Sequence, residues 1–380
     1  MEKIRVIFIS SVKPEESSAA SVNFYRHLVG KEEIELHVLP AEHFEITGGS
    51  FFSRILPKLR QTAMKGLAEY LDHLLHRHWD FSKGLPSPKQ LGISGKAVVL
   101  TLAYKNGCWI AQNYAKRHGL PLAVRFDDWW PDCIPCAPIF KNRIEKDWMK
   151  LAREADVSIC ISEGMREALG LGADSPVVLP IPPAGRERSS KPASAERPFR
   201  VCYLGNMSDY GPMLEGLARL ALKQDRVRIE FRGPKPSWDE EFQAEMRTKG
   251  LLHGFGQGEE FEKWFASFDA YLVAMFFDRG QRRRVETCFA TKLMEYLAIG
   301  KPIVIWAPES AAVTKWAIVG RRARCVNSSD PKVLLASLSM LAENPEDQIQ
   351  LGNAARSAYE RDCSPAQIQD QFLQSLQEAI

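Results

Sequence analysis

Two charged residues stand in an otherwise apolar stretch of the sequence, CFATKLMEYLAIGKPIVI, which spans Cys288–Ile305. Lys292 and Glu295 are three positions apart, so a helix presents both side chains on one face, while leucine, methionine and isoleucine residues supply a broad apolar surface. Because the segment follows a predicted parallel strand, the helix start at Thr291 directs free backbone N–H groups and the positive end of the helix dipole toward the carboxyl edge of the sheet. The pattern predicts a phosphate site with a carboxylate one turn further on.

The Lys292–Glu295 pair and the arginines before the helix each have an alternative interpretation that involves no ligand. Lys292 and Glu295 also have the spacing of a weak surface ion pair, although their apolar neighbours and the position after a strand argue against it. Arg282, Arg283 and Arg284 precede the helix in the loop that follows the strand. Guanidinium groups match phosphate geometry, so these arginines are candidate phosphate ligands; the alternative is a solvated basic loop.

Paired carboxylates follow another predicted strand, Leu122–Phe126. Asp127 and Asp128 are candidates to orient or deprotonate a substrate hydroxyl, and the indoles of Trp129 and Trp130 offer flat faces that stack on rings, sugar rings among them. The alternative is that one aspartate caps a turn and one tryptophan belongs to the core. Adjacent aspartates lack the spaced D-x-D pattern that holds a divalent metal, so no metal site is predicted here.

A CxxC motif follows at Cys133 and Cys136. A zinc site needs four ligands, and no second CxxC or CxxH lies nearby. Pro135 and Pro138 favour a loop, whereas a redox dithiol usually begins a helix. We interpret these cysteines as structural thiols.

Short apolar runs alternate with helical patterns through the first half of the chain. Such alternation predicts a parallel sheet covered by helices on both faces. The predicted strands are Ile4–Ile9, Ile34–Leu39, Ala97–Leu102, Leu122–Phe126, Val157–Ile161 and Val177–Leu179. Helical patterns between them include Ala19–Leu28, Trp109–Arg117 and Ile144–Glu154.

The alternation stops at a segment rich in proline, serine and charge, PIPPAGRERSSKPASAERP, and then starts again. The strands predicted after it are Phe199–Leu204, Val227–Phe231, Ala270–Ala274 and Pro302–Trp306. We therefore predict an α/β protein of two doubly wound domains, 1–183 and 199–363, with a linker at 184–198 and a last helix at 364–380. Each sheet binds ligands at the carboxyl ends of its strands, so the two edges are expected to face a cleft.

Composition excludes several classes of protein. The 380 residues are 45% hydrophobic and 26% charged with a formal net charge of +3, which is too small to indicate a nucleic-acid binder. No apolar stretch approaches the roughly 18 residues of a membrane span. The eight cysteines are scattered, mostly in or beside apolar runs, as in reduced proteins. We expect a cytoplasmic protein without nucleic-acid partners.

The segment Phe51–Trp79 carries an apolar stripe on an otherwise basic surface. If it is one helix, its lysines and arginines suit docking on anionic lipid at the inner face of a membrane. Packing of the helix within its own domain is the alternative.

The stretch after Cys288 resembles the donor-nucleotide helix of GT-B glycosyltransferases, particularly those of family four, which read F-P-S-K-L-x-E-Y-L-A-x-G-K-P-V. Eleven residues match in register: Phe289, Thr291, Lys292, Leu293, Glu295, Tyr296, Leu297, Ala298, Gly300, Lys301 and Pro302. Weaker resemblance covers Pro121–Asp132, Ala155–Leu169 and Phe199–Leu220. The resemblance implies a GT-B fold, in which the first domain binds the acceptor, the second binds the donor and the last helix crosses back to the first domain. It also implies that Glu295 holds the ribose hydroxyls of a nucleotide sugar and that donor binding needs no metal or other cofactor.

The sequence departs from the family pattern at three places. Many members carry two glutamates eight positions apart. Counted back from Glu295, the first would stand at position 287, but the nearest glutamate is Glu286, one place earlier; Glu286 is counted as a candidate donor-sugar contact. The usual basic pair near the start of the second domain is missing, although Gly205 and Asn206 occupy that turn and are counted as donor contacts. The Gly-Gly turn common after the first strand is missing as well.

Together these features predict a glycosyltransferase that moves a sugar from a nucleotide donor, such as a UDP-sugar, to a glycan or lipid-linked acceptor. The resemblance implies retention of anomeric configuration and a role in bacterial polysaccharide or glycoconjugate synthesis. Stabilisation of the departing diphosphate is the expected main catalytic effect. The alternatives are a sugar-nucleotide epimerase of the same fold and a nucleotide-binding scaffold without turnover.

Overall fold

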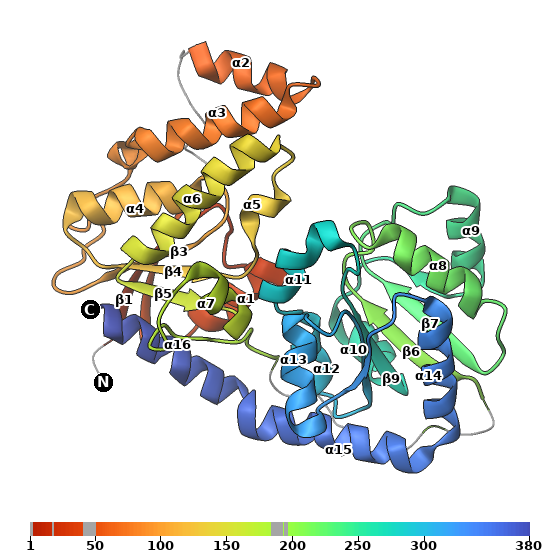
Figure 1. Ribbon diagram of the computed structural model, residues 1–380. Coiled ribbons are helices and arrows are strands. Elements are labelled where there is room, and N and C mark those ends of the chain that lie inside the picture. The colour runs from red at the N-terminus through yellow and green to blue at the C-terminus, as the bar shows by residue number, and fades with distance from the viewer. Residues whose placement is uncertain (1–2, 17–18, 41–50, 184–192, 194–196) are drawn as a thin grey trace. The chain divides into compact units, whose positions relative to one another are not determined.

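The computed structural model describes residues 3–16, 19–40, 51–183, 193 and 197–380 (Figure 1). Most of the predicted linker 184–198 lies outside the described residues. The chain divides into two compact units. Unit 1 comprises Met1–Ile181, Thr287–Phe289 and Ala366–Ile380, and unit 2 comprises Pro182–Glu286 and Ala290–Pro365.

Unit 1 is built on a five-stranded parallel sheet in the order β2-β1-β3-β4-β5. Its strands are β1 (Ile4–Ser10), β2 (Ile34–Pro40), β3 (Val98–Leu102), β4 (Leu122–Phe126) and β5 (Val157–Cys160). Each lies within one residue of its predicted bounds. The prediction of a sixth strand at Val177–Leu179 is wrong, because Val177 makes only an isolated bridge to Cys160.

Helices flank this sheet (Figure 1). They are α1 (Ala19–Leu28), α2 (Phe51–Arg60), α3 (Lys65–His78), α4 (Gly107–His118), α5 (Trp130–Cys133), α6 (Pro138–Glu154), α7 (Glu163–Leu169) and α16 (Pro365–Ala379), with a 3₁₀ turn at Phe81–Gly84. Local chemistry sets several ends: the Ser162 side chain accepts a hydrogen bond from the Met165 amide at the start of α7, and Gly170 ends that helix with a φ of 68°.

The single helix predicted for Phe51–Trp79 is wrong. The chain turns between α2 and α3, where the Thr62 hydroxyl donates to the Leu59 carbonyl and accepts from the Met64 amide. The apolar stripe folds onto itself at this turn, because Leu56, Ala68 and Leu75 are buried in one small cluster. The leucine stripe therefore serves helix packing in unit 1.

The C-terminal helix α16 belongs to unit 1, as the resemblance implies. The His27 ring on α1 lies 3.0 Å from the Gln369 side-chain oxygen, and the Gln369 amide donates to the His27 carbonyl at 3.0 Å. The same ring stacks on Phe372 at a centroid distance of 4.2 Å. Burial lowers the pKa of His27 well below its usual value, so this contact uses a neutral imidazole.

Unit 2 is built on a six-stranded parallel sheet in the order β11-β10-β9-β6-β7-β8. Its strands are β6 (Phe199–Leu204), β7 (Val227–Arg232), β8 (Leu252–His253), β9 (Ala270–Ala274), β10 (Ile303–Trp306) and β11 (Arg324–Val326). The four predicted strands are present, whereas the short edge strands β8 and β11 were not predicted. Two doubly wound α/β domains are thereby confirmed.

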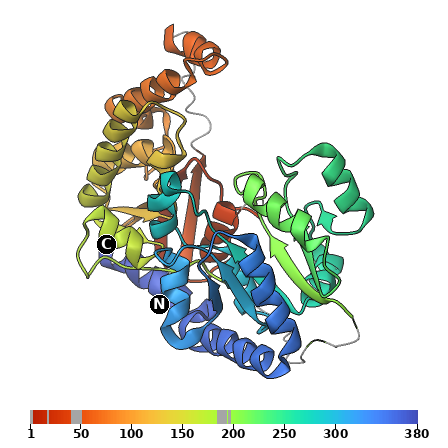
Figure 2. The ribbon, with the colours of Figure 1, turned by 45° about the vertical axis from the view of Figure 1, so that its right-hand side comes forward.

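The helices of unit 2 are α8 (Gly211–Ala221), α9 (Glu240–Thr248), α10 (Gly258–Ala266), α11 (Arg282–Thr287), α12 (Lys292–Leu297), α13 (Ala312–Ile318), α14 (Pro331–Glu343) and α15 (Pro345–Asp362), with 3₁₀ turns at Arg279–Gln281 and Val319–Arg321. The blue helices α14 and α15 lie beside the sheet in Figure 2, where α15 contacts α12 and β10. Gly300, with a φ of 75°, lies just past α12, which is the position predicted for it.

Candidate functional site

The sheet of unit 2 has one topological switch point, between β6 and β9. From β6 the chain winds outward through β7 and β8, and from β9 it winds the other way through β10 and β11. Loops that follow the two central strands diverge there, and open α/β sheets generally bind their ligands at such a point, beyond the carboxyl ends of the strands. Gly205 and Asn206 follow β6, while α12 comes after the loop from β9. The predicted donor residues Gly205, Asn206 and Lys292 meet at this point.

Lys292 is the centre of the arrangement. Its amine donates a hydrogen bond to the Tyr203 hydroxyl at 2.9 Å and lies 4.0 Å from the centroid of that ring. The Tyr210 ring lies further away, at 5.6 Å. Burial lowers the pKa of Lys292 to about 7, and nearby Cys202 opposes the shift only in part. At neutral pH the Lys292 side chain therefore exists as a mixture of the ammonium and the neutral amine.

Two glycines allow the loop after β6 to lie close to this amine. A Cβ atom on Gly205, whose φ is 129°, would lie 3.0 Å from the Lys292 amine nitrogen. A Cβ on Gly233, at the end of β7 with a φ of 156°, would lie 2.2 Å from the Gly205 carbonyl oxygen. A side chain is therefore excluded at Gly233 by the Gly205 backbone, whereas at Gly205 it would displace the Lys292 amine and strain the positive φ.

Asn206 shapes the loop. Its side-chain oxygen accepts hydrogen bonds from the amides of Ser208 at 2.8 Å and Asp209 at 3.3 Å, which is an Asx turn. Its carbonyl accepts from the Tyr203 hydroxyl at 2.8 Å. The side-chain oxygen of Asn206 thus holds the turn in position. The backbone carbonyl of Asn206 is connected to Lys292 through the Tyr203 hydroxyl.

The weak Lys292–Glu295 ion pair is not what the structure shows. In the described part of the chain, Lys292 is directed to Tyr203 and has no carboxylate partner. Glu295 lies one turn further along α12 and is half-buried. Two amides of the first turn are already used, because Leu293 donates to the Ala290 carbonyl at 2.9 Å and Met294 donates to the Thr291 carbonyl at 3.0 Å. The lysine side chain is thus a stronger candidate for an anion than the helix terminus.

The three arginines lie on the short helix α11, so the prediction of a loop is wrong at Arg282–Arg284. The Arg282 side chain is 73% exposed and pairs with Glu286 at 2.7 Å. Arg284 lies 3.5 Å from an Asp209 carboxylate oxygen, and its guanidinium is 5.5 Å from the Phe276 ring centroid. Since Asp209 belongs to the loop after β6, Arg284 lies at the switch point. Arg283 is exposed on the same helix.

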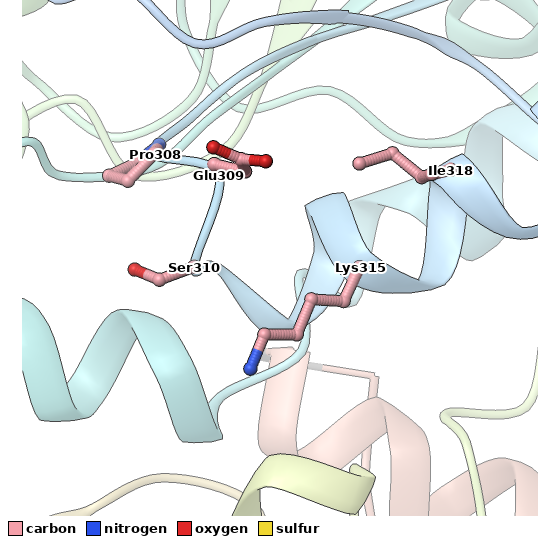
Figure 3. A pocket seen from close by; sticks show the side chains of 5 residues that line it. All are labelled: Pro308, Glu309, Ser310, Lys315 and Ile318. Carbon is pink, nitrogen blue, oxygen red and sulfur yellow. The ribbon is translucent and has the colours of Figure 1, made fainter.

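Glu286 adjoins a pocket at the carboxyl end of β10. Its carboxylate accepts hydrogen bonds from Arg282 and Ser310; burial raises its pKa, but these bonds outweigh burial and hold the pKa below its usual value. Pro308, Glu309, Ser310, Lys315 and Ile318 line a cavity of about 680 Å³ (Figure 3). The side chains of Glu309 and Ile318 point toward one another across it (Figure 3).

The aspartates of unit 1 have different surroundings. Asp127 accepts a hydrogen bond from Arg125 at 2.7 Å, and the Arg125 guanidinium also donates to the Val178 carbonyl at 3.1 Å. Burial raises the pKa of Asp127 and neighbouring Asp128 adds to the effect, whereas Arg125 opposes it. Asp128 is exposed. Of the two, Asp128 is open to solvent, and Asp127 is engaged by a buried guanidinium.

Neither tryptophan after these aspartates is placed for sugar stacking. Trp129 is 1% exposed and packs against Trp148 at a centroid distance of 4.8 Å. Trp130 is buried and contacts the Tyr104 and His73 rings. Both indoles belong to the core, so the stacking interpretation was wrong.

The two cysteines of the CxxC motif lie at the end of α5 and in the loop before α6. Cys133 is exposed, Cys136 is partly exposed, and both are free thiols. Among the described residues, the structure contains no cluster of three or more His, Cys, Asp or Glu side chains suited to a metal ion. Within the same residues, no helix has the length and apolar character needed to cross a membrane.

Sequence reasoning missed the tyrosines around Lys292. Tyr203 is the penultimate residue of strand β6, where an aromatic residue is typical of the core, and Tyr210 caps the start of α8 six residues after that strand. Asp209 was likewise not singled out, although it lies beside Arg284. In the sequence, the glycine directly after β6 indicates that the backbone approaches another group closely at this point, and the positive φ of Gly205 agrees with this.

The comparisons agree on the fold. The sequence matches no protein-family model and no curated protein. Among solved structures, HepE of Anabaena in complex with UDP and glucose is 13% identical, with a TM-score of 0.61 over 98% of this chain and 99% of HepE. The lipopolysaccharide outer core galactosyltransferase WaaB is also 13% identical, with a TM-score of 0.56 over 99% of this chain and all of WaaB. TarM of S. aureus is 10% identical, with a TM-score of 0.52 over 74% of this chain and 54% of TarM. This chain therefore has the GT-B fold.

Proposed function

We propose that this protein is a glycosyltransferase that uses a nucleotide-sugar donor. The observation that carries the proposal is the Lys292 amine, which lies at the switch point of the unit 2 sheet, against Gly205 and without a carboxylate partner in the described residues. A partly buried cation at such an edge suits an anionic ligand. HepE, which shares the fold, was solved with UDP and with UDP-glucose, and this supports a UDP-sugar as the donor class.

The roles of the donor residues follow from their positions. Lys292 contacts the diphosphate, with Arg284 beside it on α11. Glu295 accepts hydrogen bonds from the ribose hydroxyls, as the sequence resemblance implies. Charge builds up on the diphosphate as the sugar leaves, so a cation already in place stabilises the transition state more than the ground state.

In unit 1, Asp128 meets the acceptor hydroxyl, because it is exposed just past β4. Asp127 positions this strand end through Arg125. We propose a glycan or lipid-linked acceptor, in the synthesis of a bacterial polysaccharide or glycoconjugate, and transfer with retention. Proton NMR of the anomeric signal in the product tests retention: an inverted signal contradicts it.

The test of the donor class is a thermal-shift panel with UDP, GDP, ADP and TDP. A nucleotide present at 100 times its Kd stabilises the protein by about 2.7 kcal/mol, so one member of the panel should raise Tm clearly. The matching nucleotide sugar is then incubated with the protein. Slow hydrolysis supports a transferase, isomerisation identifies an epimerase, and binding without turnover identifies a scaffold. No shift with any nucleotide contradicts the proposal.

We also propose a peripheral contact between helices α2 and α3 and anionic lipid, which places the protein on the inner face of a membrane. Arg60 is engaged by Glu69 and Asp72, whereas Lys58 and Lys65 are exposed. Charge reversal at Lys58 and Lys65 spares the Arg60 ion pairs. Sedimentation with vesicles of phosphatidylglycerol and phosphatidylcholine should fall in this double variant. Equal sedimentation of the variant and wild type leaves these helices with a packing role alone.

A further inference from the structure

The hydrogen bonds of the Lys292 amine have a fixed direction. The Tyr203 hydroxyl donates its hydrogen to the Asn206 carbonyl at 2.8 Å, so its oxygen is left to accept from Lys292 at 2.9 Å. A neutral amine can make this donation as well as an ammonium can. The tyrosine therefore holds the lysine in place without requiring a positive charge on it.

The surroundings of the amine are poor in compensating charge. The rings of Tyr203 and Tyr210 attract an ammonium, but they are neutral and do not offset its burial. The lowered pKa of about 7 is consistent with these contacts. Asp209 is engaged by Arg284 at 3.5 Å. Cys202 on β6 acts electrostatically on the amine, and Tyr203 and Tyr210 contact it. Asp209 in the loop after β6 acts on Tyr203, Arg284 on α11 lies beside Asp209, and Glu295 lies one turn further along α12.

The backbone of Gly205 leaves the amine open on one side. A side chain at this position would occupy the space beside the nitrogen, since its Cβ would lie 3.0 Å away. An ammonium has three N–H donors, and Tyr203 uses one. Phosphate oxygens entering beside Gly205 can accept the others, and a charge-assisted bond of this kind favours the protonated form of the lysine.

We propose that at pH 8 Lys292 is mainly a neutral amine in the free protein and takes up a proton from solvent when a nucleoside diphosphate group binds beside it. This inference rests on the proposed function, because it assumes a nucleotide-sugar donor at this site. The buffer supplies the proton, which forms an N–H bond on the amine, and no covalent bond breaks in the protein or ligand. Release of the nucleoside diphosphate after transfer returns the proton.

The test is isothermal titration calorimetry at pH 8 with the nucleotide that the thermal-shift panel identifies. Titrations in HEPES and in Tris, whose ionisation enthalpies differ, give the number of protons taken up. With a pKa of about 7 in the free protein, wild type should take up about 0.9 proton per nucleotide. Lys292→Arg should still bind but take up none, because arginine stays charged at this pH.

The pH dependence of affinity provides a second readout. Between pH 7.5 and 9, Kd for wild type should rise nearly tenfold per pH unit, while Kd for Lys292→Arg should stay level. Binding by wild type without proton uptake, or equal uptake by Lys292→Arg, overturns the inference and leaves the proposed function standing. Failure of wild type to bind any nucleotide of the panel overturns both.

Discussion

Each sheet has a cation near the carboxyl ends of its strands, fully buried at Arg125 and partly buried at Lys292, and the protein surrounds the two cations with different groups. In unit 1, Arg125 is fully buried and is engaged by the Asp127 carboxylate and the Val178 carbonyl. In unit 2, the contacts of the Lys292 amine within the described residues are the neutral Tyr203 hydroxyl and the rings of Tyr203 and Tyr210. A cation neutralised within the protein stabilises the fold, whereas a cation without a carboxylate is available to a ligand. The comparison separates a structural charge from a functional one.

The largest expected effect follows from removing the structural cation. Arg125→Met leaves the Asp127 carboxyl buried without its partner, and breaking a buried pair in this way costs about 3–5 kcal/mol of unfolding free energy. Urea denaturation followed by circular dichroism measures it. The double variant Arg125→Met with Asp127→Asn should recover part of the loss. A cost below about 1 kcal/mol would show that the pair is not structural.

The next largest effect concerns the aspartates. Asp128→Asn should lower kcat by about 100-fold or more, because an acid–base group typically contributes a factor of 10²–10⁴. Asp127→Asn should act chiefly on stability, since its carboxylate is engaged by Arg125. Both variants are first checked for folding, and their kcat values are then compared by steady-state kinetics of sugar transfer. A folded Asp127→Asn with the greater loss of kcat reverses the assignment.

The smallest expected effect is the change in unfolding free energy when Lys292 is substituted at pH 7, and this change depends on pH. Lys292→Met loses one hydrogen bond to Tyr203, so it should cost less than about 1.5 kcal/mol at pH 7. The pKa of Lys292 is about 7 in the folded protein, below the unfolded value of 10.5, so between these values the unfolded chain holds a proton that the folded chain has released. Wild type should therefore gain stability over the variant as pH rises from 7 to 10.5. A difference that stays constant over this window contradicts the lowered pKa.

Much of the fold could be predicted from sequence because strand burial leaves a local pattern. The apolar runs that form β4, β6 and β9 have the predicted bounds, and Gly300 ends α12 as expected. The short edge strand β8 has only two residues, too few to show a period. The break between α2 and α3 was missed because the apolar stripe continues across it and the turn depends on Thr62.

The site was predicted less completely because its contacts join residues far apart in the chain. The fold brings Lys292 to the switch point, as the pattern indicated, but its partner Tyr203 is 89 residues earlier and no spacing rule connects them. The ion pair considered for Lys292 was the one that helical spacing offers. In unit 1 the Asp127 carboxylate was assigned to catalysis from the sequence. Its hydrogen bond with Arg125, two residues earlier, was missed because a strand pattern does not show that Arg125 is buried.

The central claim is that the switch point of unit 2 binds a nucleotide, with Glu295 on its ribose. The direct measurement compares the Kd of the ribonucleoside diphosphate with that of its 2′,3′-dideoxy analogue. Wild type should prefer the ribonucleotide by about 10- to 150-fold, because hydrogen bonds to a carboxylate contribute about 1.5–3 kcal/mol. Glu295→Ala should bind the two about equally, and the control Glu286→Ala should keep the wild-type preference. If Glu295→Ala keeps that preference, its carboxylate does not hold the ribose and the assignment of the donor site is wrong.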